Sequence, residues 1–345
     1  MDIDLDNMGA HDVDSEKVVS HIQNFADSCE KAYETFSITG IILPNTIENV
    51  VLIGMGGSGM ANDMVASLLG ETVSMPVESI HDYNIPKYVD AKTLVVLTSY
   101  SGDTAEPISA FEQAKAANAK MVVVTSGGKL QSLAKENENI CLDIDYKSQP
   151  RFALPYMFMA VYCIFEKMKL VDKLDMANIL IALKSCAAKC DLSVDKATND
   201  AKILAMKLAG KIPVVWADEK MYSVGVRFKT DLNETAKNFA FCEQLPELNH
   251  NAIAGIVFPK NAVHILQLSS NFASTEIATR HLVSAEILKN NAISSDMIKF
   301  VGTKTRVEEM LLGCLFFDWV SYYVAILNQQ DPSDIANVKY LKGKL

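Results

Sequence analysis

Three short apolar runs in the first half of the chain are each followed by a turn of small or polar residues and then by a helical pattern. The runs are VVLI (residues 50–53), LVVL (94–97) and MVVV (121–124). Continuous apolar runs of this length are typical of parallel strands that are buried on both faces. Because such strands alternate with helices, the sequence predicts a doubly wound parallel sheet.

A second strand–helix series follows a hydrophobic helical stretch. Its expected strands are KIPVVWAD, NAIAGIVFP, AVHILQLSS and ISSDMIKFVG. Its expected helices lie around residues 223–241 and 274–291, and a last long helix begins at Arg306. The predicted fold class is therefore α/β, with two doubly wound parallel-sheet subdomains, each an αβα sandwich, a helical connection and a C-terminal helix. The predicted segments are an N-terminal helical segment (1–47), with a helix from about Val13 to Glu34, a first subdomain (48–150), the connection (151–192), a second subdomain (193–302) and the C-terminal helix and tail (303–345).

The composition excludes several classes of protein. Of the 345 residues, 49% are hydrophobic and 21% are charged, which is ordinary for a globular chain. The net charge of −10 offers no basic field for nucleic acid or an anionic membrane. The seven cysteines form no CxxC pair and no zinc-type cluster, so buried free thiols are expected. The acidic N-terminus does not resemble a signal peptide, and the sequence predicts a cytoplasmic protein.

The first turn, GMGGSGM (54–60), is rich in glycine and precedes a helix expected from about Met60. Glycines let the backbone come close to a ligand, and a helix N-terminus attracts an anion. Gly54, Gly56 and Gly59 have the GxGxxG spacing, but this motif alone is weak evidence for a dinucleotide. The next strand, VESIHDY, also lacks a well-placed acid for a ribose. Binding of NAD is therefore not expected.

The second turn, TSYSGDTAE (98–106), places the hydroxyls of Ser99, Ser101 and Thr104 around one helix start. Hydroxyls and backbone N–H groups suit a phosphate. Simple capping of the helix is the alternative, since serine and threonine also cap well. Three hydroxyls beside a glycine turn favour phosphate binding. The third turn, TSGG (125–128), is expected to have a supporting role.

These motifs resemble those of a known family. GMGGSG with SYSGDTAE resembles the sugar isomerase (SIS) domain, which binds phosphosugars. Two such units, with QPR (149–151) before ALPY and with NETAK…PELNHN, resemble the small bifunctional phosphoglucose/phosphomannose isomerases of archaeal type, within the phosphoglucose isomerase superfamily. The resemblance spans nearly the whole chain and is weakest in the first forty residues. It implies interconversion of glucose 6-phosphate and mannose 6-phosphate with fructose 6-phosphate through a cis-enediol(ate).

The resemblance also implies roles for particular residues. Glu234 matches the family's base, His250 the group that opens the sugar ring, and Arg151 a cation that stabilises the enediolate. Lys342 is the best match to a C-terminal lysine that reaches the site, although Lys339 and Lys344 lie close by. The implied substrate-binding residues are Gly56, Gly57, Ser58, Ser99, Ser101 and Thr104. No metal and no cofactor are expected, and the expected partner besides the phosphosugar is a second copy, in a homodimer where His250 crosses the interface.

Several alternatives stay open at this stage. Glu234 and Lys237 have the spacing of a solvated ion pair on a helix. Thr235 and Ala252 depart from the family's motifs at positions beside the implied catalytic residues. Ser333 is a candidate for the residue that tolerates both sugar epimers, without a secure alignment. His264 is expected in the core, and His81, near the glycine turn, has no assigned role.

Other functions are also compatible with SIS-type motifs. A non-catalytic phosphosugar sensor would not need Glu234 and His250, and such proteins usually add a basic DNA-binding segment that this acidic chain lacks. An amidotransferase-type enzyme that makes glucosamine 6-phosphate would need the N-terminal nucleophilic cysteine of a glutaminase half, which is absent from this sequence.

Overall fold

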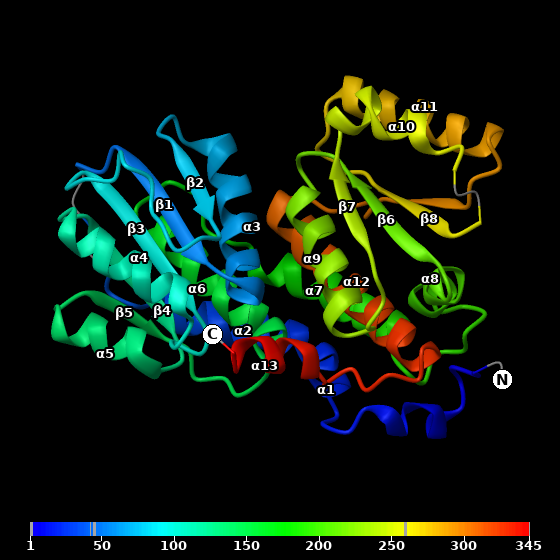
Figure 1. The fold of residues 1–345 in the computed structure, drawn as a ribbon, viewed down its shortest axis with the longest axis horizontal. Coiled ribbons are helices and arrows are strands. Elements are labelled where there is room, and N and C mark those ends of the chain that lie inside the picture. Colours follow the sequence, from blue (N-terminus) through cyan, green and yellow to red (C-terminus); the bar gives the residue numbers. More distant parts are fainter. Residues whose placement is uncertain (1–2, 42, 44–45, 259–260, 345) are drawn as a thin grey trace. The chain divides into compact units, whose positions relative to one another are not determined.

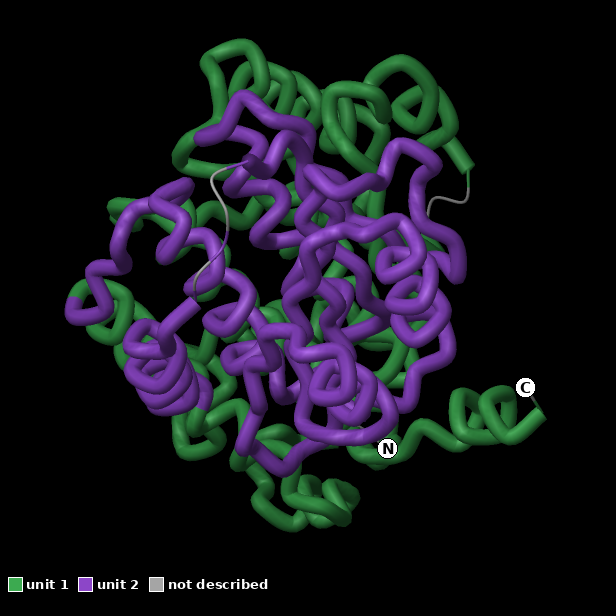
Figure 2. Tube along the Cα trace, turned by 90° about the vertical axis from the view of Figure 1, so that its left-hand side faces the viewer, with its two compact units in different colours: residues 1–24, 178–345 green, residues 25–177 purple. Residues whose placement is uncertain are grey.

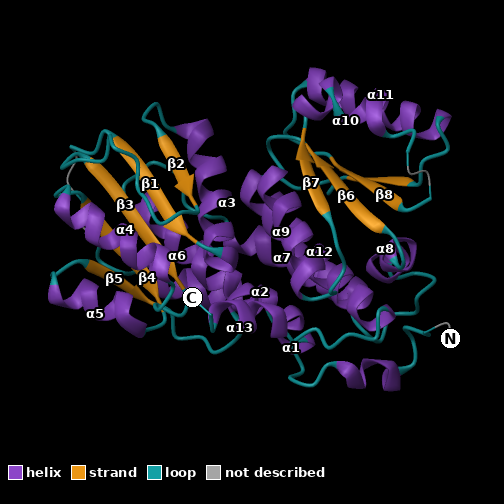
Figure 3. Cartoon of the chain, in the orientation of Figure 1, coloured by secondary structure: helices purple, strands orange, loops and turns teal. Residues whose placement is uncertain are grey.

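The computed structural model describes residues 3–41, 43, 46–258 and 261–344, which form two compact units (Figure 2). Unit 1 comprises residues 1–24 and 178–345, and unit 2 comprises residues 25–177. Each unit contains one parallel sheet with helices around it (Figure 3). The predicted α/β class with two parallel-sheet subdomains is therefore confirmed, whereas the predicted segment boundaries stay predictions.

Unit 2 is built on a five-stranded sheet in the order β2-β1-β3-β4-β5 (Figure 1). Its elements are α2 Phe25–Ser37, β1 Asn49–Gly54, α3 Gly56–Thr72, β2 Val77–Ile80, β3 Thr93–Ser99, α4 Ala105–Ala116, β4 Lys120–Thr125, α5 Gly128–Glu136, β5 Ile140–Asp143, η2 Pro150–Ala153 and α6 Leu154–Lys167. All of its strand pairs are parallel. The order of the strands reverses between β1 and β3, where ligands bind in many sheets of this kind.

The uniformly apolar strands are explained by burial on both faces of this sheet. Val51, Ile53, Val95 and Leu97 pack with Phe111 of α4 in one core cluster. Since successive side chains point to opposite faces, the alternate residues of the same strands point to the other face. That face carries α3 and α6, which also contact each other.

Unit 1 contains a parallel four-stranded sheet in the order β7-β6-β8-β9. Its elements are η1 Met8–Val13, α1 Val19–Gln23, α7 Met176–Cys190, α8 Asp200–Leu208, β6 Ile212–Ala217, α9 Tyr222–Glu234, β7 Phe241–Gln244, η3 Glu247–His250, α10 Ala252–Gly255, β8 Val263–Leu268, α11 Thr275–Asn290, β9 Ser295–Ile298, α12 Arg306–Leu327 and α13 Ala336–Lys342. Here too every strand pairing is parallel, and the order reverses between β6 and β8.

Two of the predicted helices differ from those in the structure. The single helix expected over residues 13–34 is wrong, because α1 and α2 are separate helices. Asn24, with φ of −90° and ψ of 12°, interrupts the helical backbone between them, and before α1 the carboxylate of Asp14 accepts the N–H groups of Val18 and Val19. The helix expected over 223–241 ends at Glu234, since Lys237 has φ of +50°, which a helix does not allow.

Two further segments also differ from the prediction. Phe241–Gln244, after the end of helix α9, form the edge strand β7. The segment NAIAGIVFP contains the short helix α10, with residue 259 outside the described part of the chain. Helix α3 begins at Gly56 rather than near Met60, so most of the glycine motif forms its first turn. The N–H groups of that first turn are thereby brought to the end of β1.

Helix α12 forms the centre of unit 1. Among the described residues it is the one helix long and apolar enough to cross a membrane by length and composition, but 89% of its apolar window is buried in the structure. Phe317 stacks on Phe228 of α9 with ring centroids 4.1 Å apart. The apolar character of α12 is therefore explained by its burial in the core of unit 1, since a helix that is hydrophobic all round is typical of a protein core.

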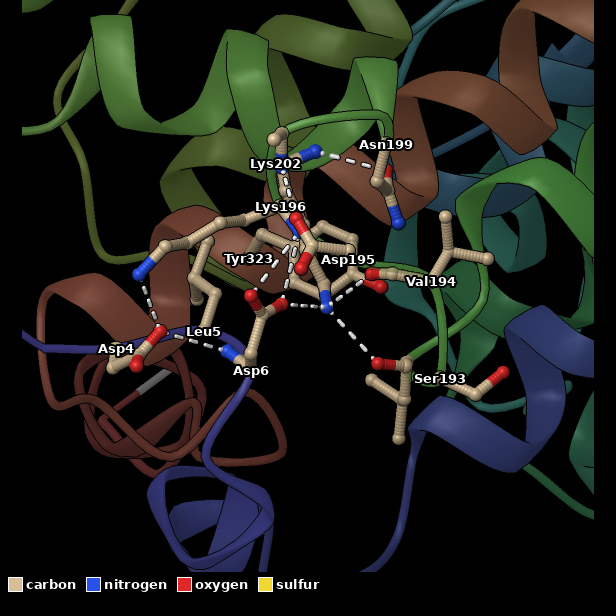
Figure 4. Close-up of polar contacts among 12 residues, drawn as sticks. Asp4, Leu5, Asp6, Ser193, Val194, Asp195, Lys196, Asn199, Lys202 and Tyr323 are labelled. Atoms are coloured by element: carbon tan, nitrogen blue, oxygen red, sulfur yellow. Dashed lines mark hydrogen bonds and ion pairs between the residues drawn. The ribbon is translucent and has the colours of Figure 1, made fainter.

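The N-terminal segment is held on unit 1 by a buried lysine. Lys202 of α8 donates to the carboxylate of Asp6 at 2.9 Å and to the carbonyl oxygens of Leu192 and Val194 at 2.9 and 2.8 Å (Figure 4). Its ammonium group also lies 5.5 Å from the centre of the Tyr323 ring. These contacts replace the water that the buried charge loses.

None of the seven cysteines forms a disulfide bond, and the predicted burial holds for four of them, whereas Cys141, Cys186 and Cys242 are partly exposed. Cys29, Cys163, Cys190 and Cys314 are buried. His264, expected in the core, is indeed 2% exposed and bonds to Ser294 and Asp296.

Candidate active site

The glycine turn and the hydroxyl turn lie side by side in unit 2, at the carboxyl ends of β1 and β3. The hydroxyl of Ser58 accepts the backbone N–H of Tyr100 at 3.0 Å and so joins the two turns. Beneath them, Thr98 donates to the side-chain oxygen of Asn62 at 2.9 Å. The first turns of α3 and α4 are therefore adjacent, and both helix N-termini favour an anion at this edge of the sheet.

The three hydroxyls of the second turn have different environments. Ser99 is 2% exposed, and its Oγ accepts the N–H of Gly102 at 3.2 Å. Ser101 is exposed and Thr104 is partly exposed, with their hydroxyl oxygens 3.4 Å apart. Thr104 occupies the N-cap position of α4, but its side chain makes no capping hydrogen bond. Capping of the helix thus does not account for the hydroxyl of Thr104.

The third turn packs directly under the second one. The hydroxyl and the backbone N–H of Ser126 both donate to the carbonyl oxygen of Tyr100. Gly102 has φ of +73°, and a Cβ atom there would lie 1.8 Å from the carbonyl oxygen of Gly127. Only glycine allows this approach. The third turn therefore packs against the hydroxyl turn, and its supporting role in binding stays a prediction.

Arg151 lies next to the glycine turn. A Cβ atom on Gly57 would lie 2.9 Å from the carbonyl oxygen of Pro150 and 3.1 Å from the backbone nitrogen of Arg151. The guanidinium group of Arg151 stacks over the Phe152 ring at 4.8 Å, and the residue is 3% exposed. Unit 2 thus brings together Arg151 and all six residues expected to bind substrate.

The other expected catalytic residues belong to unit 1. Glu234 is the last residue of α9 and is partly exposed. Two residues nearby fix the chain after this helix: Asn233 donates to the carbonyl oxygen of Asn238 at 2.9 Å, and the ammonium group of Lys237 donates to the carbonyl oxygens of Thr235 and Asp331. The carboxylate is therefore carried by a firmly connected helix end.

His250 is the last residue of the short helix η3 and is exposed. The helix is anchored by Leu248, which is buried in a core cluster with Trp216 and Leu245. Next to the histidine, Asn249 donates to the hydroxyl of Ser284 at 3.0 Å. A rigid backbone thus presents an imidazole to the outside of the unit.

Glu234 and His250 lie toward opposite ends of the strand β6. After Glu234, the side chain of Asn238 donates to the carbonyl oxygen of Lys211, just before β6. Before His250, the N–H of Leu245 donates to the carbonyl oxygen of Ala217, the last residue of β6. At a rise of about 3.3 Å per residue, the strand between these two anchors spans roughly 20 Å. Within one chain, the two side chains are therefore far apart.

Lys342 and Ser333 lie near the C-terminus of unit 1. Lys342 is the last residue of α13, and its side chain is exposed. Ser333 is 4% exposed and donates to the carboxylate of Asp331 at 2.6 Å.

Unit 1 has its own strand reversal, between β6 and β8, but carboxylates of the chain occupy its anion-binding positions. The N–H of Ser270 donates to Asp218 at 2.7 Å, and the N–H of Asn271 donates to Glu309 at 2.6 Å. Both carboxylates are almost completely buried, and burial raises the pKa of Glu309. These two N–H groups at the strand reversal of unit 1 thus already have acceptors within the chain, whereas the hydroxyl turn of unit 2 has Ser101 exposed and Thr104 partly exposed.

Sequence patterns left His81 without a role, yet it lies beside the glycine turn. It directly follows β2, the strand next to β1, and its ring bonds to Gly54 and Asp63. A polar residue just after a strand is the only local signal for it. Of the described residues, no three His, Cys, Asp or Glu side chains are grouped so that they could hold a metal ion.

Comparisons with known proteins agree with this arrangement. Residues 46–167 match the SIS domain family, and residues 197–345 match the bacterial phospho-glucose isomerase C-terminal SIS domain. A solved structure from Thermus thermophilus, described as a glucose-6-phosphate isomerase like protein, shares the fold with a TM-score of 0.63 at 16% identity, covering 99% of this chain and 100% of that chain. The class of protein is therefore a chain of two SIS-type units.

Two relatives define the family more closely. A bifunctional phosphoglucose/phosphomannose isomerase from Caldicellulosiruptor bescii is 31% identical, over 94% of this chain and 97% of its own length. An enzyme of the same name from Thermoplasma acidophilum is 28% identical, over 94% and 99% of the two chains. The chain belongs to the bifunctional phosphoglucose/phosphomannose isomerase family.

Proposed function

We propose that the chain interconverts glucose 6-phosphate and mannose 6-phosphate with fructose 6-phosphate. The observation that carries this function is the family membership, which extends over 97% of a relative's length and includes both SIS-type regions. The open hydroxyl turn beside the glycine turn supports it, since this turn suits the phosphate that the three sugars share.

The phosphate binds at the hydroxyl turn of unit 2. Ser101 and Thr104 donate their hydroxyl protons to phosphate oxygens, with N–H groups from the first turn of α4. Ser58 and Ser99 lie beneath and hold the backbone of Tyr100 and Gly102 in place, and each hydroxyl keeps a proton to donate. Gly56 and Gly57 let the sugar approach the backbone of α3.

Glu234 acts as the base. Its carboxylate takes the proton from C2 of the open-chain aldose and returns it to C1, which yields the ketose through a cis-enediolate. Arg151, fixed beside the glycine turn, stabilises the negative charge of this intermediate. Lys342 contributes a second cation from the exposed end of α13. Because loss of the C2 proton makes that carbon planar, glucose and mannose 6-phosphate give the same intermediate.

His250 opens the sugar ring by moving a proton at the ring oxygen, which suits an imidazole near neutral pH. It reaches the site from the second chain of a homodimer. The positions of Glu234 and His250 toward opposite ends of β6 support this arrangement, because one chain cannot direct both side chains at neighbouring sugar atoms. In a twofold dimer the same exchange would complete both sites.

A coupled assay for fructose 6-phosphate tests this function. The purified chain is given glucose 6-phosphate or mannose 6-phosphate, and Glu234→Gln is compared with Glu243→Gln, a carboxylate of β7 that is outside the proposed machinery. We expect product from both sugars, a loss of kcat of roughly 10²- to 10⁴-fold in Glu234→Gln, and little change in the control.

Other outcomes would separate the alternatives. Product from glucose 6-phosphate alone would contradict activity on both epimers. Binding of phosphosugars without turnover of either one would contradict the enzyme and favour a sensor. Equal activity of Glu234→Gln and the wild type would exclude Glu234 as the base.

A further inference from the structure

His81 connects the two ends of the glycine turn. Its Nδ1 lies 2.6 Å from the carbonyl oxygen of Gly54, at the end of β1. Its Nε2 lies 3.0 and 3.2 Å from the two carboxylate oxygens of Asp63, one turn further along α3 than the glycines. One imidazole therefore connects the last residue of the strand to the helix that begins after the turn.

The ring also contacts the turn itself. A Cβ atom on Gly59 would lie 2.7 Å from both Cε1 and Nδ1 of His81. No real side chain tolerates such a contact, so Gly59 is the residue that lets the ring approach. The turn is thus bonded to His81 through Gly54 and Asp63, and Gly59 leaves the space that the ring occupies.

The hydrogen-bond partners determine the charge of His81. A carbonyl oxygen and a carboxylate only accept hydrogen bonds, so both ring nitrogens must carry protons to bond with them. The imidazole is therefore a cation in this geometry. The hydrogen bond to Asp63 is the main cause that raises the pKa of His81, while burial acts in the opposite direction.

The surrounding charges are few. Asp63 on α3 faces the ring, Glu78 on β2 is engaged by the hydroxyl of Tyr88 at 2.6 Å, and Asp82 accepts the N–H of Asn84 within its own loop. Asp63 is therefore the acid that the structure places in contact with the imidazolium. The side chain of His81 is 39% exposed, so solvent can exchange its proton.

We propose that His81 is a positioning residue for the phosphosugar site: held by Asp63, its protonated ring fixes the glycine turn that receives the substrate. This role rests on the proposed function, and it goes beyond the residues expected to touch the sugar. When the ring loses its proton, it can no longer donate to both partners, and the turn is released from either β1 or α3. Affinity for the phosphosugar then falls.

The dependence on pH follows from this linkage. The bound form of the turn needs the proton on His81, so affinity is full below the folded-state pKa of His81. Above that pKa it decreases by up to about tenfold per pH unit, until the affinity of the neutral form is reached. The phosphate group of the sugar itself titrates near pH 6, and more of its dianion forms as the pH rises. The ratio of wild-type to variant affinity removes this shared contribution.

The test measures the dissociation constant of glucose 6-phosphate by calorimetry from pH 6 to 9, with His81→Gln, Asp63→Asn and Asp82→Asn as variants of the full chain. Asp82→Asn is the matched control, because its carboxylate is in the same loop without contacting His81. We expect His81→Gln to weaken binding at pH 6 to 7 by about tenfold or more and to lose the pH-dependent step, and Asp63→Asn to shift the step to lower pH. The control should retain both.

The kinetic and NMR readouts separate positioning from mere stability. Positioning raises KM more than it lowers kcat, and the His81 ring resonances of the wild type should titrate with a pKa that Asp63→Asn lowers. Equal affinity of His81→Gln and the wild type would overturn the proposal, as would weaker binding whose ratio to the wild type is constant with pH. A wild type that binds but does not isomerise would contradict the proposed function alone, whereas a wild type that does not bind would overturn both.

Discussion

The ammonium group of Lys202 lies 2.9 Å from the carboxylate of Asp6, a residue 196 positions earlier in the chain. The lysine side chain is completely buried, while that of Asp6 is 29% exposed. This ion pair, with the two carbonyl oxygens that share the lysine, connects the N-terminal segment to the core of unit 1.

Removal of this lysine should therefore destabilise the protein. Lys202→Met fills a similar volume but removes the cation that pairs with Asp6, which keeps the backbone N–H of Lys196, and leaves two carbonyl oxygens without this donor. We expect a loss of about 3 kcal/mol in the free energy of unfolding. Lys196→Ala is the matched control, because its bond to Asp4 is exposed and should contribute little. Denaturant unfolding of both variants measures the difference, and equal midpoints would contradict the role of Lys202.

The exchange of His250 between chains predicts complementation. Glu234→Gln, which lacks the base, and His250→Ala, which lacks the group that opens the ring, should each have little activity in converting the cyclic sugar to fructose 6-phosphate. After unfolding and refolding together in equal amounts, half of the dimers are mixed, and each of these has one intact site. We expect about a quarter of wild-type activity. A mixture that stays inactive, although the subunits have exchanged, would contradict donation of His250 by the second chain.

The unused capping position of Thr104 leads to another prediction. Thr104→Ala should raise KM roughly tenfold or more, because a hydrogen bond to a charged phosphate is lost. Its stability should stay unchanged, since the side chain makes no capping bond. In contrast, Thr305 caps α12 through the N–H of Glu308, so Thr305→Ala should lose about 1 kcal/mol of stability. Assays of KM and thermal unfolding on both variants distinguish binding from capping.

The close packing of Gly57 against the backbone of residues 150–151 can also be tested. Gly57→Ala places a methyl group 2.9 Å from the carbonyl oxygen of Pro150, so the segment that carries Arg151 must shift. Because small displacements of a catalytic group are costly, we expect kcat to fall at least about tenfold. Gly70→Ala, in open space on the same helix, should stabilise α3 by about 1 kcal/mol and leave kcat unchanged. Wild-type kcat in Gly57→Ala would show that Arg151 does not depend on this contact.

Much of the fold can be predicted from local sequence patterns. The apolar runs at residues 50–53, 94–97 and 121–124 are strands β1, β3 and β4, because burial on both faces leaves a signal in a few consecutive residues. The sequence pattern does not predict the edge strand β7. Its residues are partly exposed, so its pattern is weak, and only pairing with β6 makes it a strand.

The sequence by itself determined the parallel α/β class, the turns that suit a phosphate and, through its motifs, the family. Only the tertiary structure decided that Glu234 and His250 lie toward opposite ends of β6, that Asp218 and Glu309 occupy the strand reversal of unit 1, and that His81 is bonded to Asp63. The physical reason is the range of the interactions. Propensity and burial pattern act over a few neighbours, whereas these relationships join residues that are distant in sequence and meet only when the sheets assemble.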